Sequence, residues 1–424
     1  MSEASKQAPF LLVVISAALL GGCGASVAPP AATVAPPVAT AVPPAAAEAT
    51  GSTADPTVGP TQCASDPEGA WNLINGRQWA DALEWAKALE GFECAAEQGS
   101  VTFEVAEGRC YALTMLRQPD RALADCNLAV ELDPSSADAH VFRGLAHASQ
   151  GRADLALADY DEAIRLDPDH AYAYANRGNA YDEMGQFDRA LTEYQRAIEL
   201  DPEASFAYRN RGVAYTRHGD TELALADFSK AIELDPTYPA AYASRADLRW
   251  QAGDVEGSLA DYDEALRLDP SAYAALTGRG SSRIDAKDFV GATQDAEAAI
   301  ALDPTRADGY YLRGLVAAYE GDDAAALIDY DKAIALQPDF LVAVSARMRV
   351  YLRQGNGAEA ITDCEQLIAA EPGEGVLYAW RGAARAMQGD EDGARADFDR
   401  AVALTTDRDL LEDIKAMQRE FGID

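Results

Sequence analysis

The stretch AYAYANRGNAYDEMGQFDRALTEYQRAIELDPEA, residues 171–204, contains the pattern that decides the fold. It is 34 residues long, and windows of this length begin at Phe103, Ala137, Ala171, Ser205, Pro239, Tyr273, Ala307, Leu341 and Gly375. Each window divides into two helical patterns around a turn that usually contains glycine, and an Asp-Pro pair or a decayed form of it closes the second pattern. A fixed period of this size is typical of a solenoid whose unit is an antiparallel helical hairpin.

Aromatic, small and proline residues return at fixed places within the window. In residues 171–204 these places hold Tyr174, Gly178, Tyr181, Ala190, Tyr194, Ala197 and Pro202. On these positions the chain resembles the tetratricopeptide repeat (TPR) family over roughly residues 69–408, with arginine in place of the usual leucine before the glycine. The resemblance implies an all-α fold, a right-handed superhelical solenoid of antiparallel helical hairpins.

The N-terminal segment predicts export and lipid attachment. An apolar run of 14 residues, Pro9–Gly22, is short for a membrane span and fits the core of a signal peptide. It ends in Leu20-Gly21-Gly22-Cys23, which resembles the lipobox of bacterial lipoproteins, where the cysteine thiol receives a diacylglyceryl group. We therefore expect an extracytoplasmic protein, lipid-anchored to a bacterial membrane through Cys23; a chance cysteine after a signal peptide is the alternative.

The same features divide the chain into five segments. Residues 1–22 are the expected signal peptide, and residues 23–62 are the lipidated cysteine followed by a tether rich in alanine and proline, which cannot bury a core. Residues 63–102 are a degenerate N-terminal cap repeat, and residues 103–408 are nine TPR repeats. Residues 409–424 form a C-terminal capping helix with apolar residues on one face.

An arginine directly precedes the small position in every repeat. The nine are Arg109, Arg143, Arg177, Arg211, Arg245, Arg279, Arg313, Arg347 and Arg381. Sixteen residues after each stands an acid: Asp125, Asp159, Glu193, Asp227, Asp261, Asp295, Asp329, Asp363 and Asp397. The two positions lie at nearly the same height in a hairpin, so we expect a bridge between arginine and carboxylate. A row of basic residues for an anionic ligand is the functional alternative.

Two cysteines replace facing residues of one repeat. Cys110 takes the small position and Cys126 the aromatic position, which predicts a disulfide in an exported protein. The alternative is that the two cysteines are independent apolar replacements, which explains them nearly as well, since Cys364 fills the aromatic position of another repeat without such a partner. Cys63 and Cys94 are a less certain second pair.

Charge and motifs exclude several function classes. Seventy acidic against 35 basic residues give a formal charge of -35, which argues against nucleic acid and anionic membrane surfaces as direct partners. We find no phosphate-binding glycine loop, nucleophile elbow or zinc-spaced cysteines. His140 and His147 occupy aromatic positions of one repeat, where packing outweighs metal binding. We expect no enzymatic activity, cofactor or metal, and membrane contact through the lipid alone.

In the TPR family the first helix of each hairpin lines a concave groove. Residues offset there from the buried stripe are the candidate peptide-binding set: Asn176, Asn179, Arg209, Asn210, Trp250, Tyr311, Tyr319 and Arg353. Amides and guanidinium groups suit a peptide backbone, and the aromatic residues suit an apolar side chain. None of these side chains is acidic. Packing between repeats is the alternative role for each.

The favoured function is a membrane-tethered scaffold that binds an extended peptide or partner protein in the groove. One alternative is a pilotin-like assembly factor for an envelope pore. Another is an accessory subunit of an envelope enzyme such as a glycosyltransferase, in which another chain would supply the activity.

Overall fold

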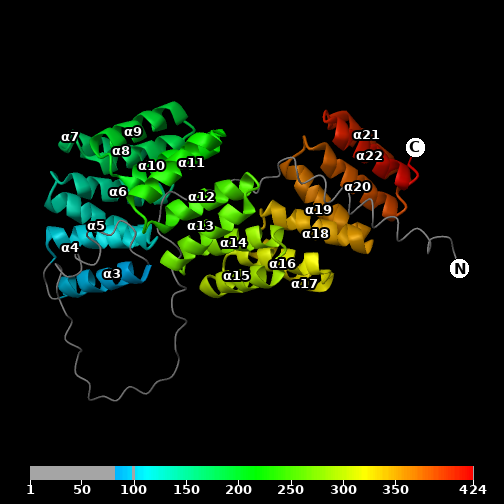
Figure 1. Cartoon of the computed structure of the whole chain (residues 1–424), viewed down its shortest axis with the longest axis horizontal. Helices are drawn as coiled ribbons and strands as arrows, with labels where there is room; N and C mark the ends of the chain where they lie inside the picture. Colours follow the sequence, from blue (N-terminus) through cyan, green and yellow to red (C-terminus); the bar gives the residue numbers. More distant parts are fainter. Residues whose placement is uncertain (1–81, 98–100, 424) are drawn as a thin grey trace, which may run out of the picture. The chain divides into compact units, whose positions relative to one another are not determined.

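A computed structural model describes residues 82–97 and 101–423 (Figure 1). The expected signal peptide, Cys23 and the tether lie outside these residues. Every element within them is an α-helix, and from α4 onward short turns join successive helices. The predicted all-α solenoid of helical hairpins is confirmed.

The chain divides into two compact units. The N-terminal unit ends at Asp288 and also includes Ala301–Asp303, and the C-terminal unit comprises Phe289–Ile300 and the chain from Pro304 onward. The division falls within the repeat 273–306, which is the weakest match to the repeat pattern in the sequence.

The N-terminal unit holds helices α3 to α14. Their bounds are α3 Ala82–Glu97, α4 Phe103–Met115, α5 Pro119–Leu132, α6 Ala137–Ser149, α7 Ala153–Leu166, α8 Ala171–Glu183, α9 Phe187–Leu200, α10 Ser205–His218, α11 Thr221–Leu234, α12 Pro239–Gln251, α13 Val255–Leu268 and α14 Tyr273–Asp285. The even-numbered helices from α4 are the first helices of the hairpins, and the odd-numbered helices from α5 are the second helices.

The C-terminal unit continues this alternation. Its helices are α15 Phe289–Leu302, α16 Ala307–Glu320, α17 Asp323–Leu336, α18 Leu341–Gln354, α19 Gly357–Ala370, α20 Gly375–Met387, α21 Glu391–Leu404 and α22 Arg408–Glu420. Helix α22 packs on α20 and α21 and buries Ile414 and Met417 in the core there.

The turn inside each hairpin requires a left-handed residue. Glycine supplies it in most repeats, as Gly185 does with a φ of 71°, because glycine has no Cβ to clash in that conformation. Arg117 and Lys287 adopt the same region with φ of 54° and 61°. The second helix often begins with an aspartate cap, as where Asp254 accepts a hydrogen bond of 2.9 Å from the Gly257 backbone N–H.

Small residues let the two helices of a hairpin approach closely. A Cβ added to Gly178 on α8 would lie 2.8 Å from the ring of Tyr194 on α9, a side chain that is 1% exposed. Glycine at this position therefore makes room for the buried aromatic ring, and the pair recurs as Gly144 with Tyr160 and Gly314 with Tyr330.

The hairpins of the N-terminal unit present two different surfaces. Successive first helices, from α4 to α14, contact one another directly, and each second helix packs against the first helices before and after it. We call the surface formed by the first helices the inner face of a unit, and the surface formed by the second helices its outer face.

Candidate functional site

The arginine row bridges the two helices of each hairpin. Eight arginines contact the acid sixteen residues later at 2.6 to 3.2 Å, and these predicted bridges are confirmed: Arg109–Asp125, Arg143–Asp159, Arg177–Glu193, Arg211–Asp227, Arg245–Asp261, Arg313–Asp329, Arg347–Asp363 and Arg381–Asp397. In the remaining repeat, residues 273–306, Arg279 and Asp295 belong to different units.

The same arginines also reach back to the preceding hairpin. Arg177 contacts Asp161 at 2.6 Å, Arg211 donates to Gln195 at 2.9 Å, and Arg279 contacts Asp263 at 2.8 Å. A single guanidinium thus links the second helix of its own hairpin to the preceding second helix, as its fork of donors permits. Because the fold itself occupies these groups, the row stabilises the solenoid and offers no free cationic surface.

The predicted amides of the inner face are engaged within the chain. Asn176 is 3% exposed and donates a hydrogen bond of 2.8 Å to the backbone oxygen of Tyr172. Asn179 accepts one of 2.8 Å from the hydroxyl of Tyr194 and donates to Asn176 at 3.4 Å. These amides therefore hydrogen-bond to α8 itself and to α9.

The next first helix repeats this arrangement. Arg209 is 7% exposed and Asn210 is 4% exposed. Arg209 donates to the Ser244 hydroxyl on α12 at 3.2 Å and to Asn210 at 3.3 Å. Asn176, Arg209 and Asn210 are buried because neighbouring first helices pack closely, which is the packing between repeats that the sequence left as their alternative role.

The remaining predicted residue of the N-terminal unit is Trp250 on α12. Its side chain is half-buried, and its indole N–H donates to Asp285 on α14 at 2.6 Å. Trp250 therefore lies at the contact between two successive first helices.

The three predicted residues of the C-terminal unit, Tyr311, Tyr319 and Arg353, lie in different environments. Tyr311 packs edge-on against Phe340, with ring centroids 5.4 Å apart, and so belongs to the packing between hairpins. Tyr319 is 55% exposed and stacks on Phe289 at 5.9 Å. Arg353 forms an ion pair with Asp323 at the start of α17. Tyr319 is thus the most accessible of the three.

A small notch opens on the inner face of the N-terminal unit. It has a volume of about 30 Å³, and its lining includes Leu145 and Ala148 from α6 and Tyr172, Asn179 and Glu183 from α8. A space of this size accommodates a water molecule or a methyl group. The notch combines apolar, amide and carboxylate groups on one open surface.

Sequence reasoning missed the carboxylates of this face. Glu107 on α4, half-buried, accepts a hydrogen bond of 3.3 Å from Ser136; burial, reinforced by the charge of Asp138, raises its pKa to about 7. Glu183 and Asp247 reach solvent, but the surrounding protein partly dehydrates both carboxyls. This raises the pKa of Glu183 and brings that of Asp247 to about 6. Each carboxylate lies three or four residues along its helix from another residue of the inner face: Glu107 from Tyr111, Glu183 from Asn179, and Asp247 from Ser244. This helical spacing could have placed all three on the inner face.

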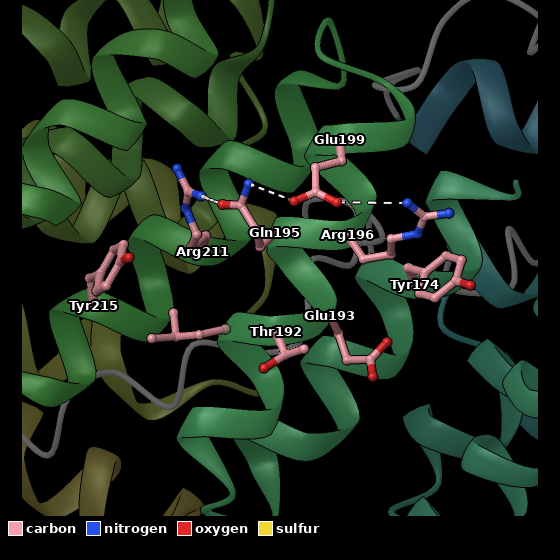
Figure 2. A pocket seen from close by; sticks show the side chains of 9 residues that line it. Tyr174, Thr192, Glu193, Gln195, Arg196, Glu199, Arg211 and Tyr215 are labelled. Atoms are coloured by element: carbon pink, nitrogen blue, oxygen red, sulfur yellow. Dashed lines mark hydrogen bonds and ion pairs between the residues drawn. The ribbon is translucent and has the colours of Figure 1, made fainter.

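A second open surface lies on the outer face, between α8, α9 and α10. Figure 2 shows this groove of about 650 Å³, with Tyr174 and Tyr215 at opposite ends. Along one edge Arg211 donates to Gln195 at 2.9 Å, Gln195 donates to Glu199 at 3.3 Å, and Glu199 pairs with Arg196 at 3.6 Å. The charged groups of this groove are therefore already paired, Glu199 with Arg196 inside it, and Arg211 and Glu193 with Asp227 and Arg177 beside it.

Comparison of the sequence with protein families decides the family. The tetratricopeptide repeat pattern matches residues 176–239, 244–307, 307–340 and 346–409, and the TPR repeat pattern matches residues 144–185. The chain belongs to the tetratricopeptide repeat family. TPR arrays are typically non-catalytic interaction scaffolds, and they commonly bind protein or peptide partners.

Solved structures show the same fold at low sequence identity. The TPR array is similar to the crystal structure of the APC/C hetero-tetramer Cut9–Hcn1, with a TM-score of 0.59 and 14% identity over 79% of this chain. It spans 66% of that chain, slightly less than two thirds. A second similar structure is the human IFIT1 dimer with m7Gppp-AAAA, with a TM-score of 0.52 and 16% identity, covering 80% of this chain and 85% of that chain. Curated protein sequences contain no match.

One hairpin of the TPR array carries a disulfide. Cys110 on α4 and Cys126 on α5 are joined with an S–S distance of 2.09 Å and a Cα–Cα distance of 4.8 Å, and neither is exposed. Cys364 is free, and burial raises its pKa to about 12. Cys94 is disulfide-bonded, and its expected partner, Cys63, lies outside the described residues.

The histidines of the second repeat take part in packing. His140 Nδ1 lies 3.5 Å from Asp159 and its Nε2 3.3 Å from the Pro134 oxygen, while His147 Nε2 lies 3.9 Å from Asp159. Over residues 82–97 and 101–423, no cluster of His, Cys, Asp and Glu is arranged to hold a metal ion. None of the described helices is both long enough and apolar enough to span a lipid bilayer.

Proposed function

We propose that this TPR protein is held at a bacterial membrane by a lipid on Cys23 and binds an extended peptide or partner protein on its inner face. The observation that carries the binding proposal is the inner face of the N-terminal unit. There an open notch lies between Leu145, Tyr172 and Asn179, with the carboxyl group of Glu183 at its edge. This mixture of apolar and polar groups suits a peptide better than a purely hydrophobic ligand.

The packing of the predicted residues refines which of them would touch a ligand. Asn179 lines the notch, Trp250 is partly exposed and Tyr319 is 55% exposed, so these three are the proposed contacts. Asn176 also borders the notch but is 3% exposed, and its amide hydrogen-bonds to the Tyr172 backbone, so we assign it a positioning role. Arg209 has the same role through its hydrogen bond to Ser244.

Membrane attachment is tested by replacing the lipidation residue. In the proposal, Cys23→Ser moves the protein from the detergent phase to the aqueous phase, because a thioether-linked diacylglyceryl group would be its anchor. Cys364→Ala serves as the matched cysteine change, since Cys364 is free and buried. Retention of the Cys23→Ser protein in the detergent phase would show that something else anchors it.

Binding is tested with a photocrosslinking amino acid placed on each face of the full-length protein. Ala148 lines the inner notch, and Thr192 lines the outer groove. We expect a discrete crosslinked species, formed in intact envelopes, from the position of Ala148 and none from that of Thr192. The reverse result would place the partner on the outer face and contradict the proposal.

A further inference from the structure

The two faces of the N-terminal unit differ in how their carboxylates are compensated. On the outer side, the arginine row holds the acids: Arg211 contacts Asp227 at 2.8 Å and Arg245 contacts Asp261 at 2.7 Å. On the inner face, Glu107 bonds to the Ser136 hydroxyl and Asp247 accepts a hydrogen bond from the Tyr262 hydroxyl. The bonds shown for these two inner carboxylates therefore come from neutral donors.

The cations of the inner face are already engaged. Arg209 is buried and bonded to Ser244 and Asn210, and Arg217 forms an ion pair with Asp182, whose side chain is 6% exposed. Within the described part of this face, neither arginine extends toward a ligand as a free positive charge. Their charges also act on Glu183 and Asp247, but the four carboxyl groups of Glu107, Asp182, Glu183 and Asp247 outnumber these two arginines, so the face keeps a net negative character.

Aromatic rings run beside these carboxylates. Tyr111 stacks on Phe142 with ring centroids 4.2 Å apart, and Tyr172 packs edge-on against Phe206 at 5.2 Å. Phe142 and Phe206 are buried, whereas Tyr111 and Tyr172 are partly exposed, and we call these two tyrosine rings the aromatic strip. Glu107 precedes Tyr111 by one helical turn, and Glu183 lies in the lining of the notch with Tyr172. Long basic side chains fit such a surface, because their alkyl stems cover apolar area while their charged ends reach carboxylates.

We propose that the inner face of the N-terminal unit binds a cationic segment of a partner protein, whose lysine or arginine side chains lie along the aromatic strip and pair with Glu107, Glu183 and Asp247. The inference rests on the proposed function, in which the inner face is the binding face, and it adds the chemical class of the ligand. An anionic segment would meet like charges there, and a neutral one would give the three carboxylates no further cation.

The probe is a fluorescent peptide of about 12 residues, long enough to span ~40 Å when extended. Three versions repeat Gly-Ser-Lys, Gly-Ser-Gln or Gly-Ser-Glu, and binding to the full-length protein is measured by fluorescence anisotropy. We expect the lysine peptide to bind at least about tenfold more tightly than the glutamine peptide, with an affinity that falls as salt is added. The glutamate peptide is expected not to bind.

Two triple variants distinguish binding at this site from the general attraction of a cationic peptide to an acidic protein. The test variant is Glu107→Gln, Glu183→Gln and Asp247→Asn, which keeps a hydrogen-bond acceptor at each position. The control variant, Asp154→Asn, Asp188→Asn and Glu222→Gln, removes the same charge from exposed positions on α7, α9 and α11.

We expect the test variant to weaken lysine-peptide binding about tenfold and the control variant to weaken it less than about twofold. Equal weakening in both would mean that only the net charge attracts the peptide, and equal binding of the lysine and glutamine peptides would also overturn the proposal. Thermal unfolding of both variants checks that neither loses its fold. Crosslinking at the position of Ala148 without any loss in the test variant would leave inner-face binding standing and reject the cationic ligand.

Discussion

Single arginines hold successive hairpins together. Arg211 makes two hydrogen bonds of 2.8 Å to Asp227 and a third of 2.9 Å to Gln195 on the preceding second helix. Its side chain is 17% exposed and that of Asp227 is 9% exposed, so solvent weakens this pair far less than it weakens a surface salt bridge. Hydrogen bonding to Asp227 is the main reason that the pKa of Arg211 is raised.

Replacing Arg211 tests the energetic role of the row. We expect Arg211→Leu to lower the free energy of unfolding by about 2–4 kcal/mol, because it leaves the carboxylate of Asp227 buried without its partner. The double change Arg211→Leu with Asp227→Val is expected to recover much of that loss. Urea unfolding of the two variants measures both effects, and a single change without cost would show that the bridge does not stabilise the protein.

Glu107 provides a residue whose effect on stability depends on pH. Its pKa of about 7 lies above that of an unfolded glutamate, so the folded state favours the protonated form and loses stability as pH rises toward 7. We expect Glu107→Gln to raise the free energy of unfolding by about 1–2 kcal/mol at pH 8. This change is smaller than the free energy that corresponds to the full pKa shift, because the side chain of Glu107 is partly exposed.

At pH 4 Glu107 is protonated in the folded state and mostly protonated in the unfolded state, so the gain from Glu107→Gln should nearly vanish. Urea unfolding at the two pH values gives the comparison. Glu256→Gln on α13 is the control, since that side chain is exposed. A gain of equal size at pH 4 and pH 8 would mean that charge is not its cause.

At the scale of the helix pair, the same two facing positions hold a small and an aromatic residue in most hairpins and a disulfide in one. A small residue on the first helix faces an aromatic residue on the second, as Gly178 faces Tyr194, and one hairpin replaces this pair with the Cys110–Cys126 disulfide. The two cysteines are 16 residues apart, the same separation as glycine and aromatic residue elsewhere. The hairpin geometry therefore places these two positions within reach of a covalent bond.

The hairpin of α18 and α19 allows this geometry to be tested. Met348 and Cys364 occupy the positions equivalent to Cys110 and Cys126, and both are fully buried. We expect Met348→Cys to form a disulfide with Cys364 on oxidation, which closes a loop of about 15 residues and stabilises the oxidised form by roughly 3 kcal/mol over the reduced form.

Peptide mapping without reduction detects the engineered bond directly. Met348→Cys combined with Cys364→Ala is the matched control, in which the new thiol should remain available for alkylation once the protein is unfolded. Two alkylated thiols in the oxidised single variant would mean that α18 and α19 hold these positions apart.

At the scale of the whole molecule, charge sets the response to salt. A net charge of -35 opposes compactness through self-repulsion, whereas the arginine bridges favour it and are partly shielded from solvent. Added salt screens exposed charges more than buried pairs. The balance of these two effects can therefore be measured on the intact protein.

We expect the melting temperature to rise by a few degrees as NaCl increases from about 0.02 M to about 0.5 M, because long-range repulsion is the term that salt weakens most. A series with sucrose at matched osmolality separates screening from general exclusion of solute. If the melting temperature instead falls with salt, the arginine bridges outweigh the repulsion.

The sequence by itself determined the helical hairpin and its most regular contact. Both are local: a period of 34 residues places glycine at the turn, and a spacing of 16 residues places Arg211 opposite Asp227 within one hairpin. Such relations follow from helix geometry alone, since the two positions lie at one height in an antiparallel pair. The family and the all-α fold followed from the same repeated positions.

The tertiary structure decided which inner-face residues remain accessible. Burial of Asn176 and Arg209 arises where one first helix meets the next, and no spacing within a single repeat encodes how closely those helices pack. Helical spacing alone could have assigned Glu107, Glu183 and Asp247 to the inner face, but how far each is dehydrated depends on the neighbouring helices. The electrostatic environment of a charged residue is set by its neighbours in the folded protein, because electrostatic interactions depend on distance and on access to water.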